Sequence, residues 1–399
     1  MRRGSTIAVV ALVAAVLGGA IALLGAELTG VNDTTTVYVP TSSSGLGLGR
    51  NEPVSRARPL VGNRFVPSRI YAARSSGVVT VFALFDKPDE HESQGSGFIV
   101  SPAGYILTSA HVVIDISGSS KTTEAKSVFV GFKDRDRLGA TVVGWDVYDD
   151  VALLKVDQSA HRLAPVPLGD SSGVRAGDPV AAMGSPFGNE DSIAVGVVSA
   201  IRRSIASLTS VYKVVDAIQI DAPITHGNSG GPLFDARGRV IGINAQIRTE
   251  TGGAEGVGFA IPINAARRSM AQLAATGRVV YAYLGVTTED LTPTLARHLG
   301  YSTTRGALVG EVRSGSPAAR AGLHGGKGDE TFNGQVITPG GDVIVAIDGR
   351  AVNSADDVVR EVSTRLPGET VRLTVVRGTE RKSVEAKLGA RPDAPETNP

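Results

Sequence analysis

The sequence predicts a mainly β fold that follows an N-terminal membrane-spanning helix. Strand-like runs rich in β-branched and aromatic residues recur about every ten residues between residues 78 and 261, and Gly, Asp and Pro separate them. An uncharged apolar run covers residues 7–26, directly after Arg2 and Arg3. Together these observations favour an all-β barrel or sandwich that is tethered to a membrane.

The apolar run at 7–26 has the length of a membrane anchor. Twenty residues in a helix extend about 30 Å, which is the thickness of the hydrocarbon layer. The two arginines predict that residues 1–6 stay in the cytoplasm. A cleaved signal peptide is the alternative, but its apolar part usually has roughly 7–15 residues and a polar break before the cleavage site. We therefore expect an uncleaved, single-pass anchor in the cell membrane.

The chain beyond the anchor divides into a tether, two folded parts and a tail. Residues 27–65 are rich in Thr, Ser, Gly and Pro, which is typical of a disordered linker. Residues 66–265 hold a short helix at 69–75 and then the predicted strands. The segment 264–277 begins with Asn264 as a helix N-cap and ends at Gly277, so a connector helix is expected near 266–280. A second folded part at 281–390 and a disordered tail at 391–399 complete the chain.

Three residues suited to nucleophilic catalysis occur in the order His111, Asp150 and Ser229. A serine hydroxyl needs an imidazole to take its proton and a carboxylate to fix the tautomer of that imidazole. His111 follows two apolar runs around a turn at 101–104, and Asp150 directly precedes the apolar run 151–156. Each residue alone also fits an ordinary turn or core position. Their conjunction predicts a triad with Ser229 as nucleophile, His111 as base and Asp150 as its orienter.

The glycines around Ser229 predict an oxyanion site. The run Gly227, Asn228, Ser229, Gly230 and Gly231 lets the backbone turn so that amides, chiefly those of Gly227 and Ser229, point at one spot. The same run fits the nucleophile elbow of the α/β-hydrolases, but that fold requires the order Ser, acid, His and a helix after the serine. Here the serine is followed by a strand, a turn and another strand, which excludes that fold.

These residues and motifs resemble the HtrA/DegP family of trypsin-like serine proteases that carry a C-terminal PDZ domain. The resemblance covers residues 66–390 and is carried by 95–113 around the histidine, 150–156, 221–233 around the serine, and 256–262. It implies two six-stranded β-barrels with the triad in their cleft, ATP-independent cleavage of misfolded extracytoplasmic proteins, and a homotrimer. It implies a substrate cleft lined by Ile224, Thr225, His226, Asn244, Ala245 and Gln246.

Two departures from the digestive trypsins bear on activation and specificity. Asn228 stands where those enzymes have an aspartate, and an amide cannot pair with a freed N-terminus, so activation by N-terminal trimming is not expected. Pro223 stands six residues before the serine, where a carboxylate would recognise Lys or Arg. We therefore expect a preference for small or medium aliphatic residues before the scissile bond.

The C-terminal part resembles a PDZ domain of the HtrA type. The motifs are Gly306 to Val309, Ser316 to Leu323, Gly341 to Gly349 and the short run Tyr283, Leu284, Gly285 and Val286. Such a domain binds a C-terminal peptide as an added strand, and by resemblance the loop at 283–286 captures its carboxylate. Residues 324–340 are an insertion that could alter peptide access or form only an extra hairpin.

The composition excludes several other classes. Lys and Arg number 40 against 39 Asp and Glu, so no basic excess indicates nucleic-acid binding. The chain has no cysteine, and its six histidines show no metal-ligand spacing, so we expect neither disulfides nor metal nor another cofactor. A second hypothesis, from a different class, is a PDZ-bearing chaperone or stress-sensing scaffold whose protease activity is latent.

Overall fold

The computed structural model describes residues 65–86, 92–115, 122–185, 192–210, 212–224, 227–245 and 257–392. The predicted anchor at 7–26 and nearly all of the predicted linker lie outside these residues. Within them, no helix combines the length and apolar character needed to cross a membrane.

The first closed barrel has the strand order β1-β2-β3-β8-β7-β6. All neighbours in it are antiparallel. Its strands are β1 (Val78–Leu84), β2 (Glu92–Ile99), β3 (Tyr105–Thr108), β6 (Ser127–Gly131), β7 (Arg137–Asp146) and β8 (Val151–Val156). Two-residue strands β4 (Ile114–Asp115) and β5 (Thr123–Glu124) pair beside it. Its interior is filled by buried aliphatic side chains such as Val81, Ile99, Ile106 and Leu154.

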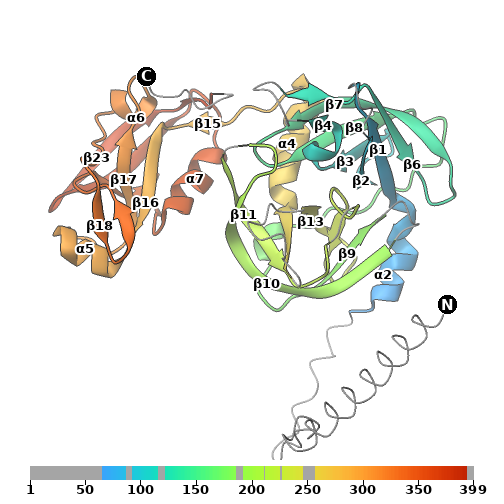
Figure 1. Cartoon of the computed structure of the whole chain (residues 1–399), viewed down its shortest axis with the longest axis horizontal. Coiled ribbons are helices and arrows are strands. Elements are labelled where there is room, and N and C mark those ends of the chain that lie inside the picture. The colour runs from blue at the N-terminus through green and yellow to red at the C-terminus, as the bar shows by residue number, and fades with distance from the viewer. Residues whose placement is uncertain are drawn as a thin grey trace, which may run out of the picture. The chain divides into compact units, whose positions relative to one another are not determined.

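The second closed barrel has the order β10-β11-β14-β13-β12-β9. Figure 1 labels its strands β9, β10, β11 and β13. Its strands are β9 (Pro179–Gly184), β10 (Ser192–Ala206), β11 (Lys213–Ile220), β12 (Pro232–Phe234), β13 (Val240–Ala245) and β14 (Gly258–Pro262). A separate apolar cluster, which includes Phe98, Leu153, Met183 and Ile243, joins strands of both barrels. The predicted mainly β class is therefore confirmed, and the open choice between barrel and sandwich resolves to two barrels.

Two α-helices flank the barrels, and both begin earlier than the sequence predicted. Helix α2 (Pro67–Arg74) starts at Pro67, because proline is favoured in the first helical turn. Helix α4 (Ile263–Thr276) packs against β7, β8 and β13, and ends at Gly277 with φ 73°. The expected N-cap role of Asn264 is wrong. Its side chain instead donates to Asp170 Oδ1 at 2.7 Å and accepts from Ser171 N at 3.4 Å, so tertiary contacts replace the cap.

The C-terminal part forms a separate sheet with its own core. Strands β16 (Val286–Leu291), β17 (Gly306–Val312), β20 (Val343–Ile347), β22 (Thr370–Arg377) and β23 (Glu380–Lys387) lie in that order, and β21 (Arg350–Ala351) pairs with β20. Helices α5 (Pro293–Leu299), α6 (Pro317–Arg320) and α7 (Ala355–Ser363) accompany the sheet. Strand β15 (Ala282–Tyr283) pairs with β24 (Gly389–Ala390), so the segment begins and ends at one place.

The inserted segment contains a two-stranded hairpin of β18 (Glu330–Phe332) and β19 (Gln335–Ile337). Short 3-10 turns at Ser75–Gly77 and Ser171–Gly173 complete the described elements.

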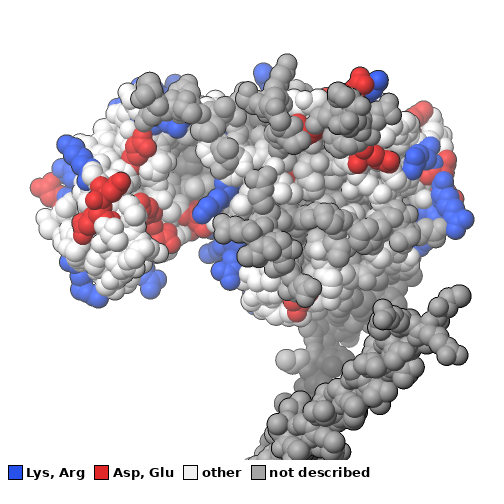
Figure 2. Space-filling model, in the orientation of Figure 1, with Lys and Arg blue, Asp and Glu red and all other residues white. Residues whose placement is uncertain are grey.

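Charged side chains of both signs occur on the face drawn in Figure 2. Where described residues are visible on the face drawn in Figure 2, basic and acidic groups lie interspersed and neither sign dominates. This distribution matches the near-zero net charge of +1. It gives no sign of the continuous basic footprint that nucleic-acid binding needs.

Candidate active site and peptide groove

The acid and the base of the predicted triad come from neighbouring strands of the first barrel. Asp150 ends the turn between β7 and β8, and His111 lies in the short helix α3 (Ala110–Val113) after β3. The distance from His111 Nδ1 to Asp150 Oδ2 is 2.7 Å. The backbone N–H of His111 also donates to Asp150 Oδ1 at 2.9 Å. The carboxylate is therefore fixed against both the ring and the main chain of the histidine.

This pairing sets the protonation of His111. Burial lowers the pKa of His111 because the charged ring loses water, but the negative charge of Asp150 and its hydrogen bond outweigh burial. The net result is a pKa above the usual value of 6.5. Because Nδ1 faces the carboxylate, that nitrogen carries the proton of the neutral ring and Nε2 remains the acceptor.

Ser229 lies in the loop before β12 and is held by main-chain bonds to both barrels. Ser96 N in β2 donates to Ser229 O at 2.8 Å, and Gly230 N donates to Asn244 O in β13 at 2.9 Å. Ser229 is only 4% exposed. Its hydroxyl makes no hydrogen bond to any of the residues described. The backbone thus positions the serine, while its hydroxyl is bonded to none of the described residues.

Two glycines of this loop are required by its geometry. Gly227 and Gly230 have φ of 96° and 85°, in the left-handed region that favours glycine. A Cβ on Gly230 would collide with Ser96 O and Thr108 Oγ1 and would lie 2.8 Å from Ser109 N. Since Ser109 is two residues before His111, the serine loop lies directly against the segment that carries the histidine. The structure thus brings the three predicted triad residues to one junction between the barrels.

The predicted oxyanion residues are Gly227, Asn228 and Ser229. Among the described residues, the amides of Gly227 and Ser229 donate to no acceptor. Two free amides beside the nucleophile are what an oxyanion site requires.

Ser96 is a supporting residue that the sequence analysis missed. Its hydroxyl donates to Gly227 O at 2.5 Å and accepts from Ser185 N at 2.9 Å, while Thr108 Oγ1 donates to Ser96 O at 2.6 Å. Ser96 is fully buried, so this hydroxyl fixes the peptide of Gly227 from the first barrel. A serine between two glycines in a buried strand was the signal available in the sequence.

The expected substrate residues divide into three groups. Thr225, His226 and Gln246 lie outside the described part of the chain. Ile224 is half-buried against the core of the second barrel. Asn244 and Ala245 are buried in β13, and Asn244 Nδ2 donates to Met183 O at 3.1 Å and to Pro232 O at 3.3 Å. Asn244 therefore braces the strands behind the serine loop.

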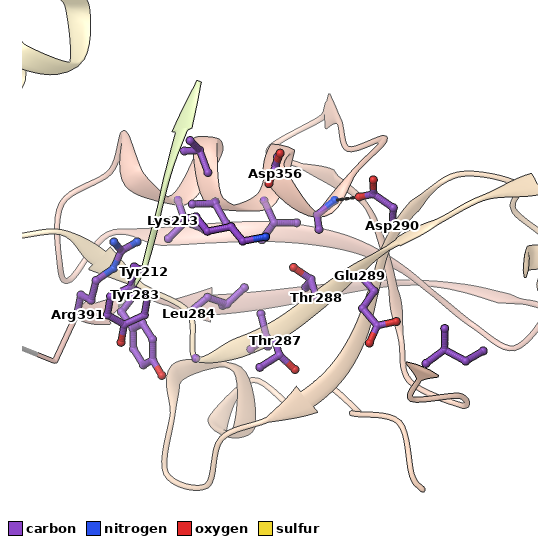
Figure 3. A pocket seen from close by; sticks show the side chains of 18 of the residues that line it. Tyr212, Lys213, Tyr283, Leu284, Thr287, Thr288, Glu289, Asp290, Asp356 and Arg391 are labelled. Carbon is purple, nitrogen blue, oxygen red and sulfur yellow. Dashed lines mark hydrogen bonds between the residues drawn. The ribbon is translucent and has the colours of Figure 1, made fainter. Parts of the chain in front are cut away.

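A groove runs along β16, the edge strand of the C-terminal sheet, and is bounded by α7 (Figure 3). Its volume is about 1030 Å³, and the predicted residues Tyr283, Leu284, Gly285 and Val286 line it. Thr288 and Asp290 point from β16 toward α7, and Asp290 Oδ1 accepts from Ala355 N at 2.7 Å. An open edge beside an apolar cavity can accept an added peptide strand.

The groove has two further walls that sequence reasoning did not assign. Gln335, Val336 and Ile337 of the β18–β19 hairpin line it, so the insertion both forms a hairpin and contributes to the groove. Tyr212 and Lys213, at the start of β11, also line it, and Lys213 extends between β16 and α7 in Figure 3. Arg360 of α7 ties this region together by an ion pair with Asp216 of β11 at 2.7 Å.

In the described part of the chain, no three metal-ligating side chains cluster.

Comparison with known proteins agrees with this architecture. Residues 95–243 match the trypsin-like peptidase domain family, and residues 282–388 match the PDZ domain family. A "Probable periplasmic serine endoprotease DegP-like" of Pseudomonas fluorescens is 40% identical over 308 residues, which are 77% of this chain and 58% of that protein. A protein of the same description from Halomonas elongata is 40% identical over 306 residues, which are again 77% of this chain and 58% of that protein. The chain thus spans somewhat more than half the length of these relatives.

Solved structures show the same relationship over almost their whole length. The HtrA-type protease AlgW with a tripeptide is 33% identical, with a TM-score of 0.68, and the match covers 83% of this chain and 99% of that one. A serine endoprotease from Yersinia pestis is 28% identical, with a TM-score of 0.57 and coverage of 82% and 98%. The paired barrels, the His–Asp pair beside a glycine-framed serine and the appended PDZ domain show that this chain belongs to the HtrA family of serine proteases.

Proposed function

We propose that the protein is an extracytoplasmic serine endopeptidase of protein quality control that cleaves unfolded or damaged proteins. The observation that carries this proposal is the doubly hydrogen-bonded pair of His111 and Asp150, which lies against the loop of Ser229. The curated relatives are described as periplasmic serine endoproteases, which supports a catalytic part outside the cytoplasm.

The chemistry follows from the roles of these three residues. His111 Nε2 removes the proton from Ser229 Oγ as that oxygen attacks the peptide carbonyl carbon, and Asp150 stabilises the imidazolium that forms. The amides of Gly227 and Ser229, with that of Asn228 beside them, stabilise the negative carbonyl oxygen. His111 then donates its proton to the leaving amine. Water, activated by the same histidine, hydrolyses the acyl-enzyme and restores Ser229.

The remaining assignments belong to the same proposal. Residues 7–26 anchor the protein in the membrane, with residues 1–6 cytoplasmic, and 27–65 tether the protease part. C-terminal peptides bind in the groove at Tyr283 to Val286. The AlgW structures contain a tripeptide and a decapeptide, which supports peptide binding in general. A homotrimer is proposed from the family alone. Pro223 and Ile224 favour aliphatic residues before the scissile bond, which a peptide library dominated by Lys and Arg would contradict.

The decisive experiment compares the chain from residue 66 with its Ser229→Ala variant on β-casein. Cleavage by the parent alone is expected, because removing a triad member costs several orders of magnitude in rate. Fragments produced equally by both proteins would contradict the assignment of Ser229.

A second candidate function is a PDZ-bearing chaperone or scaffold with latent protease activity. The observation that favours it is the unbonded hydroxyl of Ser229, since a nucleophile not yet joined to its base is compatible with a resting state. Equal suppression of client aggregation by the parent and by Ser229→Ala, without fragments, would decide for this alternative.

A further inference from the structure

The turn that carries Asp150 is shaped by a second, buried carboxylate. Asp146 ends β7 and pairs with Val151 of β8, so residues 147–150 form the connecting turn. Asp146 Oδ1 accepts from Tyr148 N at 2.9 Å and from Asp149 N at 3.3 Å. Asp150 follows directly and has φ 53°, a conformation that costs energy in a residue with a side chain. The position of Asp150 therefore depends on where the carboxylate of Asp146 lies.

The other oxygen of Asp146 is held from outside the first barrel. Asp146 Oδ2 accepts from Ser269 Oγ of α4 at 2.6 Å and from the Tyr281 hydroxyl at 2.6 Å. Tyr281 is the residue directly before β15, where the chain enters the PDZ domain. Asp146 and Tyr281 are 1% and 6% exposed, so water does not compete for these bonds. One carboxylate thus joins the turn of Asp150 to the connector helix and to the start of the PDZ domain.

The neighbouring Asp149 completes the cluster. The Tyr281 hydroxyl lies 2.8 Å from Asp149 Oδ2 as well as 2.6 Å from Asp146 Oδ2. A phenol has one proton to donate, so the second contact is favourable when Asp149 itself carries a proton. Burial, followed by the charge of Asp146, raises the pKa of Asp149 to about 6, while the hydrogen bond from Tyr281 and the charges of Arg268 and Arg391 oppose this rise. The Tyr281 hydroxyl therefore lies within donating distance of both carboxylates and links Asp149 to Asp146.

The end of the PDZ domain encloses the same tyrosine. Arg391 N donates to Tyr281 O at 2.9 Å, and Tyr148 OH donates to Pro392 O at 2.9 Å. The Arg391 guanidinium lies over the rings of Tyr148, Tyr212 and Tyr281, at 4.9, 5.1 and 5.2 Å from their centroids. Both ends of the PDZ domain therefore hold Tyr281 against the turn that precedes Asp150.

We propose that Tyr281 is a positioning residue for Asp150, acting through Asp146 and the turn 147–150. This inference rests on the proposed protease function. The hydroxyl of Tyr281 and that of Ser269 set the orientation of Asp146, and Asp146 fixes the turn from which Asp150 reaches His111. Tyr281, which directly precedes the PDZ domain, thereby helps to hold the catalytic acid Asp150 in place.

The test is Tyr281→Phe in the full chain, with Tyr301→Phe as the matched control. Tyr301 OH donates to Gly341 O at 2.6 Å within the PDZ domain, so each variant loses one hydrogen-bonded tyrosine hydroxyl. We expect Tyr281→Phe to lower kcat on a peptide substrate about tenfold with KM nearly unchanged, because misplacing a catalytic group impairs the chemical step. Tyr301→Phe is expected to keep the parent's kcat.

A second measurement does not require turnover. The low-field proton resonance of the His111–Asp150 hydrogen bond, assigned by its loss in His111→Ala, should shift or broaden in Tyr281→Phe and stay in place in Tyr301→Phe. If the parent itself fails to cleave, the proposed function is wrong, and this resonance still tests the positioning role.

Two results would overturn the inference. One is a Tyr281→Phe protein with the parent's kcat and an unshifted resonance. The other is an equal loss of kcat in both tyrosine variants, which would show a merely structural effect. Should Tyr281→Phe fail to fold, Ser269→Ala removes the other donor to the same oxygen of Asp146. It is expected to produce the same shift, and an unchanged kcat and resonance would contradict the proposal.

Discussion

The two halves of the active site are built differently. In the first barrel, side-chain and main-chain bonds of 2.7 and 2.9 Å join His111 to Asp150. In the second barrel, the backbone holds Ser229 on both sides, but its hydroxyl bonds to none of the described residues. In the proposed site, hydrogen bonds thus fix the acid–base pair, whereas no hydrogen bond to a described residue fixes the hydroxyl of the nucleophile.

The largest expected effect comes from the first half. The two oxygens of Asp150 accept from the backbone N–H and from Nδ1 of His111. Asp150→Asn replaces one of these oxygens with an NH₂ group, so only one acceptor remains. It also favours the wrong tautomer of the imidazole. We expect kcat to fall about ten-thousandfold, as measured on a peptide substrate. A fall of less than tenfold would mean that the fixed pair is not the acid–base unit.

The second half is tested by Gly230→Ala. A Cβ here meets Ser96 O and Thr108 Oγ1, at a φ of 85°. We expect the serine loop to shift and kcat to fall by about a hundredfold. Gly315→Ala is the control, because Gly315 has φ 67° but nothing within 4 Å of an added Cβ. Equal kcat values for the two variants would show that the contact between the loop and the first barrel is unimportant.

A smaller effect, on stability, is expected from Ser96, which joins the first barrel to the serine loop. Ser96→Ala leaves Gly227 O without its donor and Ser185 N without its acceptor, both in the interior. The free energy of unfolding should decrease by about 2 kcal/mol, as measured by urea denaturation. Ser109→Ala is the matched control, since Ser109 is equally buried and its hydroxyl has no partner among the described residues. A comparable loss in the control would refute the bridging role of Ser96.

The smallest expected effect is the pH dependence of kcat/KM that the His111–Asp150 pair produces. Asp150 raises the pKa of His111 above 6.5 despite burial. Because the general base must be neutral, kcat/KM should fall as pH decreases through this raised pKa, with a midpoint above pH 6.5. For stability the sign is opposite, since a raised histidine pKa stabilises the fold at low pH and this contribution is lost as pH rises. A kcat/KM midpoint below 6.5 would contradict the assigned environment.

The sequence was sufficient for features that depend on local pattern. Recurring apolar runs separated by Gly, Asp and Pro predicted the barrel strands, and Asp150 was identified because it directly precedes a continuous apolar strand. The residues that the sequence analysis missed are joined by long-range contacts. Ser96 and Gly227 are 131 positions apart, and Asp146 and Tyr281 are 135 apart. Asn264 looks like a helix cap by its neighbours, but a distant turn supplies its actual partners.

The pairing of β15 with β24 has a practical consequence for protein engineering. Residues 282–283 and 389–390 are adjacent strands of one small sheet, so the first and last residues of the PDZ segment lie next to each other. A foreign domain whose termini lie close together should be exchangeable at these points with little strain on the barrels. Such a chimera must retain Tyr281 before the first junction and Arg391 after the second, since both side chains contact the protease part.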